Sequence, residues 1–340
     1  MPHMYLTESD IKLGFSQGQV VVTKLSDGSK QEYPFSLIDG ISVFGKAQIS
    51  TQLIRECLAA NVPISYYSGD GHYFGATHSF ERIDPSRQKK QIYLTDNRQF
   101  CVEWSRLIVG AKIHNSIKLL ASMRDVCSFS EEEVAGLRHS LQCVKDADSV
   151  EAILGFEGNA AKNYFKCLPK LLRNEDFMFE GRSARPPKDP FNSMLSYGYS
   201  IFYRNIIGAI ESHGLHPYFA FMHKTKFGHA SLASDLIEEY RAVLVDKTVI
   251  DFVNSGEVDV SEFHPNDEGA IYMDKSASRR LTNIFSEIMV ANRKYFLSGG
   301  DGRSFGFQAM LDKKLNSVID AIEHRDPFRY KPFIWKDEDW

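Results

Sequence analysis

The spacing of apolar side chains changes once along this chain of 340 residues, and this change constrains the fold most. In the first 80 or so residues, short β-branched runs such as 19–25 are separated by turn signals. Asp27-Gly28 lies between two of these runs and predicts a β-hairpin. From about residue 86, apolar residues recur with the 3.6-residue period of amphipathic helices. The sequence therefore predicts an α+β fold, with a small β-rich domain over 1–80 and a larger all-α domain over 86–330.

The same pattern predicts individual elements. Residues 50–60 are expected to form a helix inside the β-rich domain, with Ser50 or Thr51 as its N-cap. Residues 179–190 contain three prolines and two arginines, which predicts a loop. The last residues, 331–340, are expected to form a tail, which is expected to be loose over 335–340. Amphipathic helices are expected over 86–124, 130–144, 148–172, 190–213, 228–245, 277–297 and 303–323.

The charge of the chain limits what kind of nucleic-acid surface it can have. A net charge of −4 and an isoelectric point of about 6.3 exclude a bulk polycation, so any such surface must be local. Residues 82–118 hold eight basic and three acidic side chains, a local charge of 8 − 3 = +5. This stripe can contact phosphates, or it can be the solvated face of a helix, and charge alone does not decide between the two.

Cysteine usage and the apolar pattern indicate the compartment. The five cysteines are scattered and contain no CxxC pair, which excludes a zinc knuckle and a redox motif. Small buried thiols in a reducing compartment are expected. The N-terminus has no basic segment followed by an apolar one, and no run of about 18 apolar residues occurs. We therefore expect a cytoplasmic protein without a membrane span.

Asp235 and Glu238 form the first candidate pair for a functional site. Their spacing places both carboxylates on one face of a helix. Two carboxylates held together raise each other's pKa unless a cation neutralises them. The pair can therefore belong to a cation site, or to a solvated acidic face that continues into Glu239 and pairs with Arg241.

His223 and Glu157 are two further candidates, each with an ordinary alternative. His223 can be a ligand or a satisfied core imidazole, and His229 competes for the same role. Glu157 stands between Gly155 and Gly158, where it can interact with the dipole of a helix N-terminus or with a group that the glycines allow to approach. Carboxylates combined with one imidazole suit Mg²⁺ or Mn²⁺, and such an ion is a common device of phosphodiester chemistry.

The order of these residues resembles one known family. Gly-x-Glu-Gly-x-Ala-Ala-x-x-Tyr-Phe surrounds Glu157, and Asp-Pro-Phe-Asn-Ser-Met-Leu-Ser-Tyr-Gly-Tyr follows at 189–199. Gly-Leu-x-Pro-Tyr-x-x-Phe-x-His then ends at His223, and Ser-Leu-Ala-x-Asp-Leu-x-Glu-Glu-x-Arg spans 231–241. This series, with a β-rich domain before a helical one, is similar to the CRISPR-associated adaptation integrases, the Cas1 family. In 214–223 the chain departs from the family's commoner Gly and Leu at two positions that supply no ligand.

The resemblance implies a site, an activity and partners. It implies that Glu157, His223 and Glu238 are metal ligands for Mg²⁺ or Mn²⁺, and that Asp235 is a further acidic residue of the catalytic site. The implied activity is that of a DNA integrase and endonuclease, which inserts prespacer DNA into a CRISPR array by attack of a 3′-hydroxyl on a phosphodiester. The implied assembly is a homodimer through the β-rich domain, with a small partner protein, Cas2, bridging two dimers into a heterohexamer on prespacer and repeat DNA.

Ten basic residues are expected to contact DNA because of their charge and their place in the sequence. They lie near the domain junction, in the 179–190 loop, beside His223 and after Glu238: Arg82, Arg87, Lys89, Lys90, Arg182, Arg185, Lys188, Lys224, Lys226 and Arg241. Two other functions remain open: a stand-alone metal-dependent nuclease without integration, and a non-catalytic DNA-binding scaffold whose carboxylates are only surface charge. A phosphomonoesterase would need a more enclosed pocket and a second cluster of ligands.

Overall fold

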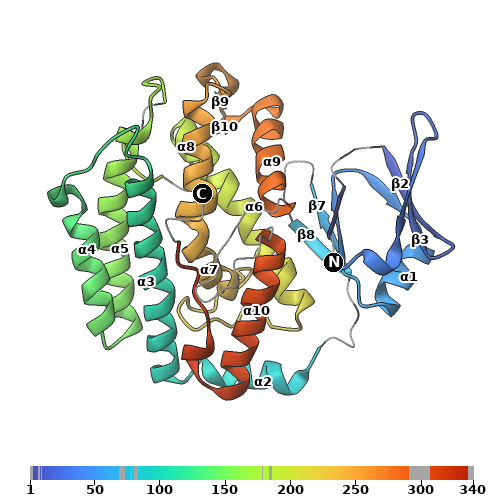
Figure 1. Ribbon diagram of the computed structural model, residues 1–340, viewed down its shortest axis with the longest axis horizontal. Coiled ribbons are helices and arrows are strands. Elements are labelled where there is room, and N and C mark those ends of the chain that lie inside the picture. Colours follow the sequence, from blue (N-terminus) through green and yellow to red (C-terminus); the bar gives the residue numbers. More distant parts are fainter. Residues whose placement is uncertain are drawn as a thin grey trace.

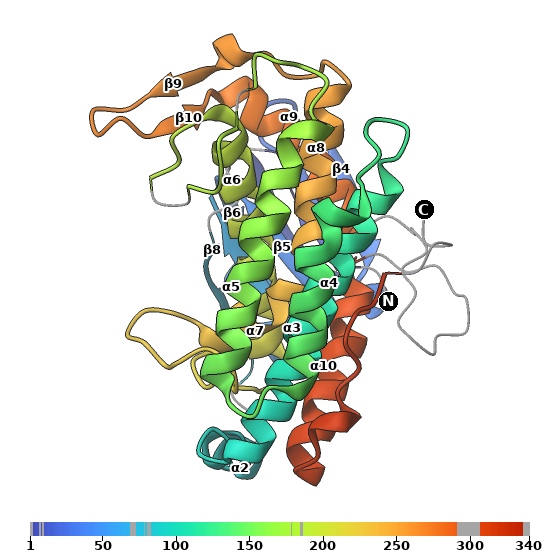
Figure 2. The same cartoon turned by 90° about the vertical axis from the view of Figure 1, so that its left-hand side faces the viewer.

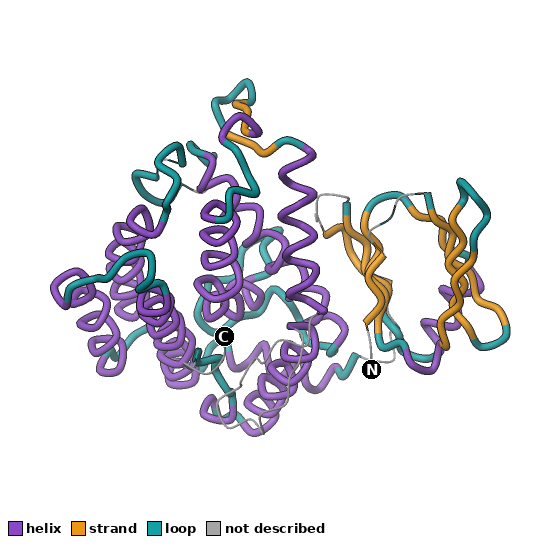
Figure 3. The backbone as a smooth tube through the Cα atoms, turned by 45° about the horizontal axis from the view of Figure 1, so that its top comes forward, coloured by secondary structure: helices purple, strands orange, loops and turns teal. Residues whose placement is uncertain are grey.

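The computed structural model has a strand-rich N-terminal lobe and a larger helical lobe (Figures 1 and 3), which confirms the predicted α+β class. Within the residues that the structure describes, no helix is both long and apolar enough to cross a membrane. The described residues are 3–6, 8, 10–68, 73–77, 79, 83–177, 179–183, 186–290 and 307–335.

Two four-stranded sheets form the N-terminal lobe. The strand order is β1-β5-β7-β8 in one sheet and β4-β3-β2-β6 in the other, and each sheet contains both parallel and antiparallel pairs. Buried side chains of both sheets and of an α-helix in this lobe, among them Leu13, Ile41 and Leu53, form a common apolar core. The strands are β1 (His3–Leu6), β2 (Ile11–Ser16), β3 (Gln19–Lys24), β4 (Lys30–Pro34), β5 (Gly40–Phe44), β6 (Ala47–Ile49), β7 (Ile64–Tyr67) and β8 (Tyr73–Thr77).

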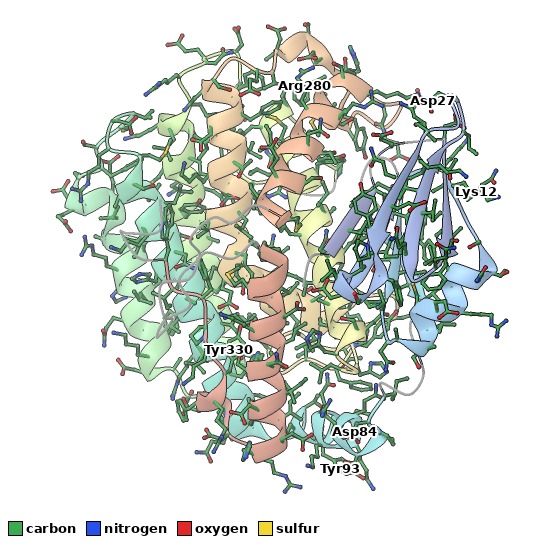
Figure 4. All side chains as sticks on the ribbon, turned by 45° about the vertical axis from the view of Figure 1, so that its right-hand side comes forward. Lys12, Asp27, Asp84, Tyr93, Arg280 and Tyr330 are labelled. Carbon is green, nitrogen blue, oxygen red and sulfur yellow. The ribbon has the colours of Figure 1, made fainter. Side chains whose placement is uncertain are left out.

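Two local predictions for this lobe are confirmed. The predicted hairpin joins β3 to β4, and Figure 4 shows Asp27 at its tip. Gly28 there has φ of +71°, which glycine adopts without steric cost, and Asp27 Oδ1 accepts a 2.8 Å hydrogen bond from the backbone two residues later. The helix predicted over 50–60 is α1 (Thr51–Ala59), and Ser50 caps it with its hydroxyl.

The helical lobe packs α3, α4 and α5 side by side, as Figure 2 shows. Helix α4 begins at a capping box in which the Ser130 side chain accepts from Glu133 N and the Glu133 side chain accepts from Ser130 N. The lobe also holds a short hairpin, β9 (Phe263–Pro265) and β10 (Ile271–Met273), which was not predicted. The helices are α2 (Pro85–Leu94), α3 (Arg98–Ser122), α4 (Glu131–Asp146), α5 (Val150–Cys167), α6 (Pro190–Ser212), α7 (Ser231–Ile237), α8 (Lys247–Asn254), α9 (Lys275–Val290) and α10 (Phe307–His324).

Two of the predicted helices are not single α-helices. The stretch 86–124 is divided into α2 and α3, because Asn97 starts a new helix by accepting a hydrogen bond from Phe100 N. The stretch 228–245 begins later, as α7, and then continues as a 3₁₀ turn (Glu238–Tyr240) and a π-helical segment (Arg241–Asp246). We call these last two pieces together the irregular segment. Residues 291–306 lie outside the described residues, and with them the end of the helix predicted over 277–297 and the start of the helix predicted over 303–323.

Helix α3 lies at the centre of the helical core. Trp104, Ile108 and Val109 on this helix are fully buried, and the buried residues of α3 lie on almost every side of it. A helix that is apolar all round is a core helix, and each large side chain buried in this way stabilises the fold by about 1.5–3 kcal/mol. A charged side chain on such a helix must therefore find a partner inside the protein.

The tail packs against the core through Phe333 and Trp335, so the expectation of a loose end over 335–340 is wrong for Trp335. Phe333 and Trp335 are only 1% and 3% exposed. The backbone N–H of Phe333 donates to the Glu239 carboxylate, and that of Trp335 donates to Asn115 Oδ1 at 2.8 Å. Two large apolar side chains with paired backbone groups are more stable in the core than in water. Residues 336–340 lie outside the described residues.

Candidate functional site

A cleft of about 270 Å³ lies between α3, α5, α6 and the irregular segment. One wall is apolar and includes Ile113, Leu137 and Phe165. The remaining lining carries charged and hydroxyl groups from all four elements and from the 179–190 loop: Lys112, Ser116, Glu157, Tyr164, Arg182, Tyr199, Glu238, Arg241 and Asp246. Two of the predicted ligands, one from α5 and one from the irregular segment, therefore share this cleft.

Glu157 and Glu238 meet at one cation, the ammonium group of Lys112. Lys112 Nζ forms an ion pair with Glu157 Oε1 and lies 2.6 Å from Glu238 Oε2. Glu238 Oε2 is buried, and within the described residues it accepts no hydrogen bond of regular geometry. Glu157 lies two turns inside α5, which begins at Val150, and so it faces Lys112 instead of the helix N-terminus. The reading of Glu157 as a residue that only interacts with a helix dipole is therefore wrong.

Arg241 neutralises the other oxygen of Glu238. Its guanidinium lies 3.0 Å from Glu238 Oε1 and 4.5 Å from the ring centre of Tyr199. Burial opposes ionisation of Glu238, but the charges of Arg241 and Lys112 lower the pKa of Glu238 to about 2. Glu238 is consequently an anion at neutral pH, as a carboxylate ligand must be.

The acidic pair is not a solvated surface. Asp235 and Glu239 are completely buried and Glu238 is 7% exposed, so the alternative of a solvated acidic face is wrong. Glu239 points into the core, where Lys314 Nζ lies 3.1 Å from its Oε1 atom. Adjacent glutamates of the same segment thus face a cleft and a dry core respectively.

Asp235 organises the loop that carries His223. Its carboxylate accepts five hydrogen bonds: from Trp104 Nε1 at 3.1 Å, from the backbone N–H groups of Phe221, Met222 and His223 at 3.0–3.1 Å, and from His223 Nδ1 at 2.9 Å. The last bond places the proton of the neutral imidazole on Nδ1 and leaves the lone pair on Nε2. A carboxylate that fixes an imidazole in this way is the usual arrangement behind a metal-binding histidine.

The pKa of His223 depends on the carboxylates of Asp235 and Glu238. Burial lowers the pKa of His223, but the hydrogen bond and charge of Asp235 and the charge of Glu238 outweigh this, so the pKa is raised above its usual value. His229, the competing histidine, is engaged elsewhere, with its Nε2 atom 2.9 Å from Ser234 Oγ. The structure therefore favours His223 over His229 as the imidazole of the site.

The carboxylates of Glu157 and Glu238 and the imidazole of His223 are donor types that fit a hard divalent cation. In this structure the ammonium group of Lys112 lies between the two carboxylates. Within the described residues no three His, Cys, Asp or Glu side chains are grouped closely enough to hold a metal ion together. Lys112 is the cation on which Glu157 and Glu238 converge, and both are anionic oxygen donors. Two carboxylates and an imidazole that presents Nε2 are the donors that Mg²⁺ and Mn²⁺ accept.

Sequence reasoning missed Lys112 and a buried cluster of Asp246 with two tyrosines, which lines the same cleft. Asp246 accepts hydrogen bonds from Tyr164 and Tyr199, and burial raises the pKa of Asp246 to about 6. Lys112 carried one signal that was available in the sequence, because this charged residue stands between two apolar residues, Ala111 and Ile113, which are both buried. The Asp246 cluster had no such signal, because its tyrosines come from two other helices.

The basic residues near the domain junction are engaged within the protein. Arg87 Nε lies 3.1 Å from Glu323 Oε1, Lys90 pairs with the same carboxylate, and Lys89 Nζ lies 5.6 Å from the ring centre of Tyr93. Figure 4 shows Asp84 and Tyr93, which mark the two ends of this helix, α2, at the edge of the helical lobe. Arg82 and Arg185 lie outside the described residues, and contact of any of these residues with DNA stays a prediction.

The basic residues closer to the cleft differ in exposure. Arg182 is held by Asn192 Oδ1 at 2.8 Å and Ser196 Oγ at 3.0 Å, so it supports the cleft wall from the 179–190 loop. Arg241 is held by Glu238, as described above. Three other cations of this set are exposed at the surface of the loops: Lys188, Lys224 and Lys226.

Comparison with known proteins shows the family of the chain. The family model described as CRISPR associated protein Cas1 matches residues 4–287. A protein of Mycobacterium tuberculosis named CRISPR-associated endonuclease Cas1 is 39% identical over 333 residues, which are 97% of this chain and 96% of that protein.

Solved structures share the fold. A chain of a partial Cas6-RT-Cas1–Cas2 complex superposes with a TM-score of 0.77 at 22% identity, covering 98% of each chain. A casposase bound to integration product superposes with a TM-score of 0.70 at 22% identity, covering 99% of this chain and 100% of that one. The family model matches most of this chain, and a named relative is 39% identical over 97% of it. This chain therefore belongs to the CRISPR-associated Cas1 family.

Proposed function

We propose that this protein is a metal-dependent DNA endonuclease and integrase that inserts prespacer DNA into a CRISPR array. The observation that carries the proposal is that Glu157 and Glu238 meet at one cationic point, near an imidazole that Asp235 holds in place. The relative in Mycobacterium tuberculosis is named an endonuclease, and one protein with the same fold is a casposase bound to integration product. These names support nuclease and integrase chemistry for this chain.

Three groups of the chain would hold the metal ion. They are the carboxylates of Glu157 and Glu238 and the Nε2 atom of His223, while Asp235 acts behind His223 as a positioning residue. Two carboxylates suit both Mg²⁺ and Mn²⁺, and the imidazole slightly favours Mn²⁺. When bound, such an ion polarises the scissile phosphate and stabilises the oxygen that leaves.

The protein's own groups contribute alignment and charge. Phosphoryl transfer depends on in-line positioning and charge neutralisation more than on covalent catalysis. Asp235 prevents rotation of the His223 ring, and Arg241 fixes Glu238 through its Oε1 atom. In the proposed reaction, the bond between the prespacer 3′-oxygen and phosphorus forms while the bond from phosphorus to the 3′-oxygen of the repeat strand breaks. The first oxygen loses a proton and the second gains one, and with water as nucleophile the same alignment gives hydrolysis.

The proposed assembly is a homodimer that works with Cas2 on DNA. A neighbour with the same fold is part of a complex with Cas2, and another is named a Cas1–DNA complex. Each sheet of the N-terminal lobe ends in edge strands, β1 and β8 in one and β4 and β6 in the other, and edges of this kind need cover. We propose that the dimer forms through this lobe and that Cas2 bridges two dimers into a heterohexamer.

A strand-transfer assay with a supercoiled plasmid that carries a repeat array tests the function. Glu157→Ala, His223→Ala and Glu238→Ala are each expected to abolish strand transfer in Mg²⁺ or Mn²⁺ while DNA binding remains. His229→Ala is the matched control, because His229 lies in the same loop but is bonded to Ser234. It is expected to retain strand transfer.

The same assay distinguishes the competing functions. Metal-dependent cleavage without joined product, even when Cas2 is added, would identify a stand-alone nuclease. DNA binding with neither cleavage nor joining, and no stabilisation by metal that depends on Glu238, would identify a scaffold. Undiminished strand transfer in the Glu157, His223 and Glu238 variants would show that the site is wrongly assigned.

A further inference from the structure

Lys112 is the central charge of the site and not a peripheral one. It projects from α3, a helix of the apolar core, and its side chain is 18% exposed. Its ammonium contacts Glu157 on α5 and Glu238 on the irregular segment. No other described ion pair at this site connects α5 with the irregular segment. Without a positive group between them, Glu157 and Glu238 would be two like charges at the edge of a core.

We propose that Lys112 is a built-in counterion, which holds the Glu157 and Glu238 carboxylates together in the metal-free protein and is displaced from them when a divalent cation binds. The inference rests on the proposed function, because it takes these two glutamates to be ligands. Lys112 is in this view a positioning residue that sets how tightly the metal is bound.

Counting charges explains why the ammonium must leave. The four groups in direct contact are Glu157 and Glu238, which carry −2, and Lys112 and Arg241, which carry +2, so the set is neutral: −2 + 2 = 0. A divalent cation that entered this set would meet no net attraction, and an ammonium would already occupy the oxygens it needs. With Lys112 withdrawn, the two carboxylates and Arg241 carry −1, which attracts the cation.

The surroundings give Lys112 room to move. The cleft of about 270 Å³ continues along the apolar wall formed by Ile113, Leu137 and Ala160. The four methylene groups of a lysine can lie on such a wall while the ammonium reaches water. Arg241 has no comparable freedom, because its guanidinium is stacked on Tyr199.

Lys314 offers a matched comparison within the same domain. It pairs with Glu239, the residue directly after Glu238, and both side chains are completely buried. Its Nζ atom also donates to the Lys331 carbonyl and lies 4.7 Å from the ring centre of Tyr330, in the core and outside the cleft. Lys314 is therefore a structural lysine, with the same kind of partner but no access to the site.

Calorimetric titration with Mn²⁺ tests the inference. Lys112→Met keeps the volume of the side chain and removes its charge, so it is expected to bind Mn²⁺ about tenfold more tightly than the wild type, which corresponds to about 1.4 kcal/mol. Its metal-free melting temperature should fall because the carboxylates repel, and added Mn²⁺ should raise it by more than in the wild type. Lys314→Met should be less stable with and without Mn²⁺ alike, with unchanged affinity. Equal or weaker Mn²⁺ binding by Lys112→Met overturns the proposal.

A second measurement uses the wild-type protein and needs no variant to fold. Acetylation of lysines by a small amine-reactive reagent, read by mass spectrometry, is expected to modify Lys112 faster when Mn²⁺ is present, while Lys314 stays unmodified. An unchanged or slower reaction of Lys112 contradicts displacement. If the wild type binds no Mn²⁺, the metal-dependent function and the displacement both fail. If it does bind and Lys112 does not respond, only the displacement fails.

Discussion

Asp235→Asn is the substitution for which the structure gives the most specific expectation. Asp235 Oδ2 accepts from Trp104 Nε1 and from the backbone of Phe221 and Met222, while Oδ1 accepts from the backbone and Nδ1 of His223. Asparagine keeps the shape but replaces one oxygen by an NH₂ group, which donates and cannot accept. The amide oxygen fits best at the Oδ2 position, where three donors meet. The NH₂ group then faces the two donors of His223.

The cost follows from the number of donors left without an acceptor. Each buried donor that loses its partner costs about 1–3 kcal/mol, so Asp235→Asn is expected to lower the free energy of unfolding by about 2–6 kcal/mol. At about 2–4 °C for each kcal/mol, the melting temperature should fall by at least about 4 °C. Urea unfolding and thermal melts followed by circular dichroism in metal-free buffer measure both quantities.

A double-mutant cycle with His223→Ala isolates the part that the imidazole contributes. Without the ring, only the backbone N–H at position 223 still needs Oδ1, so Asp235→Asn should cost about 1–3 kcal/mol less in that background. Strand transfer should fall in Asp235→Asn alone and should not fall further than in His223→Ala alone. Asp246→Asn is the matched control, because the two tyrosine hydroxyls that bond Asp246 can rotate and accept from an amide. Equal costs of Asp235→Asn in both backgrounds would refute the reasoning.

Three further predictions concern stability. Burial raises the pKa of Asp246 from 3.8 to about 6, so the folded protein holds the proton of this carboxyl more tightly than the unfolded chain does. The stabilisation that this proton gives is complete below pH 4. It falls by about 3 kcal/mol as the pH rises through 6. Asp246→Asn should remove that part of the pH dependence in urea unfolding at pH 4.5 and 7. Gly198→Ala should lower the free energy of unfolding by about 1–3 kcal/mol, because the new Cβ would lie 2.6 and 2.7 Å from side-chain carbons of Val245 and Phe285. Gly136→Ala is the comparison, because its Cβ would meet only the amide end of the Asn163 side chain. It should raise the free energy of unfolding by up to about 1 kcal/mol. Phe333→Ala should lower the free energy of unfolding by about 3–5 kcal/mol, and an unchanged urea midpoint would show that this segment is not part of the core.

The fold could be predicted as far as local chemistry determines it. Gly28 supplies the positive φ of the hairpin, and Ser50 supplies the first cap, so both elements are where the sequence places them. The division between α2 and α3 was missed, because the apolar period continues across Asn97 and only the cap itself ends it. The burial of Phe333 and Trp335 was missed because their partners are distant: Asn115 lies 220 residues before Trp335. Contacts of that separation leave no periodic trace in the sequence.

The site shows the same limit. The motifs give the order of Glu157, His223, Asp235 and Glu238, but they do not show what neutralises or orients these groups. The cation between the glutamates comes from α3, 45 residues before Glu157, and one donor to Asp235 comes from 131 residues before it, at Trp104. Asp235 was predicted as a further acidic residue of the catalytic site, and its five hydrogen bonds go to Trp104 and to the loop that carries His223.

The irregular segment explains how one stretch of chain serves both the cleft and the core. Val245 follows Glu238 by seven residues, which is close to two turns of an α-helix. On a regular α-helix, Val245 would therefore lie on the same face as Glu238, and Asp246 would point away from that face. A π turn closes its hydrogen bond over one more residue than an α turn, so the register shifts by one and Asp246 joins Glu238 and Arg241 in the cleft. Glu239 meanwhile points into the core. Since π turns are rarer and less favourable than α turns, their presence directly after a proposed ligand indicates that the placement of these charges outweighs helix regularity here.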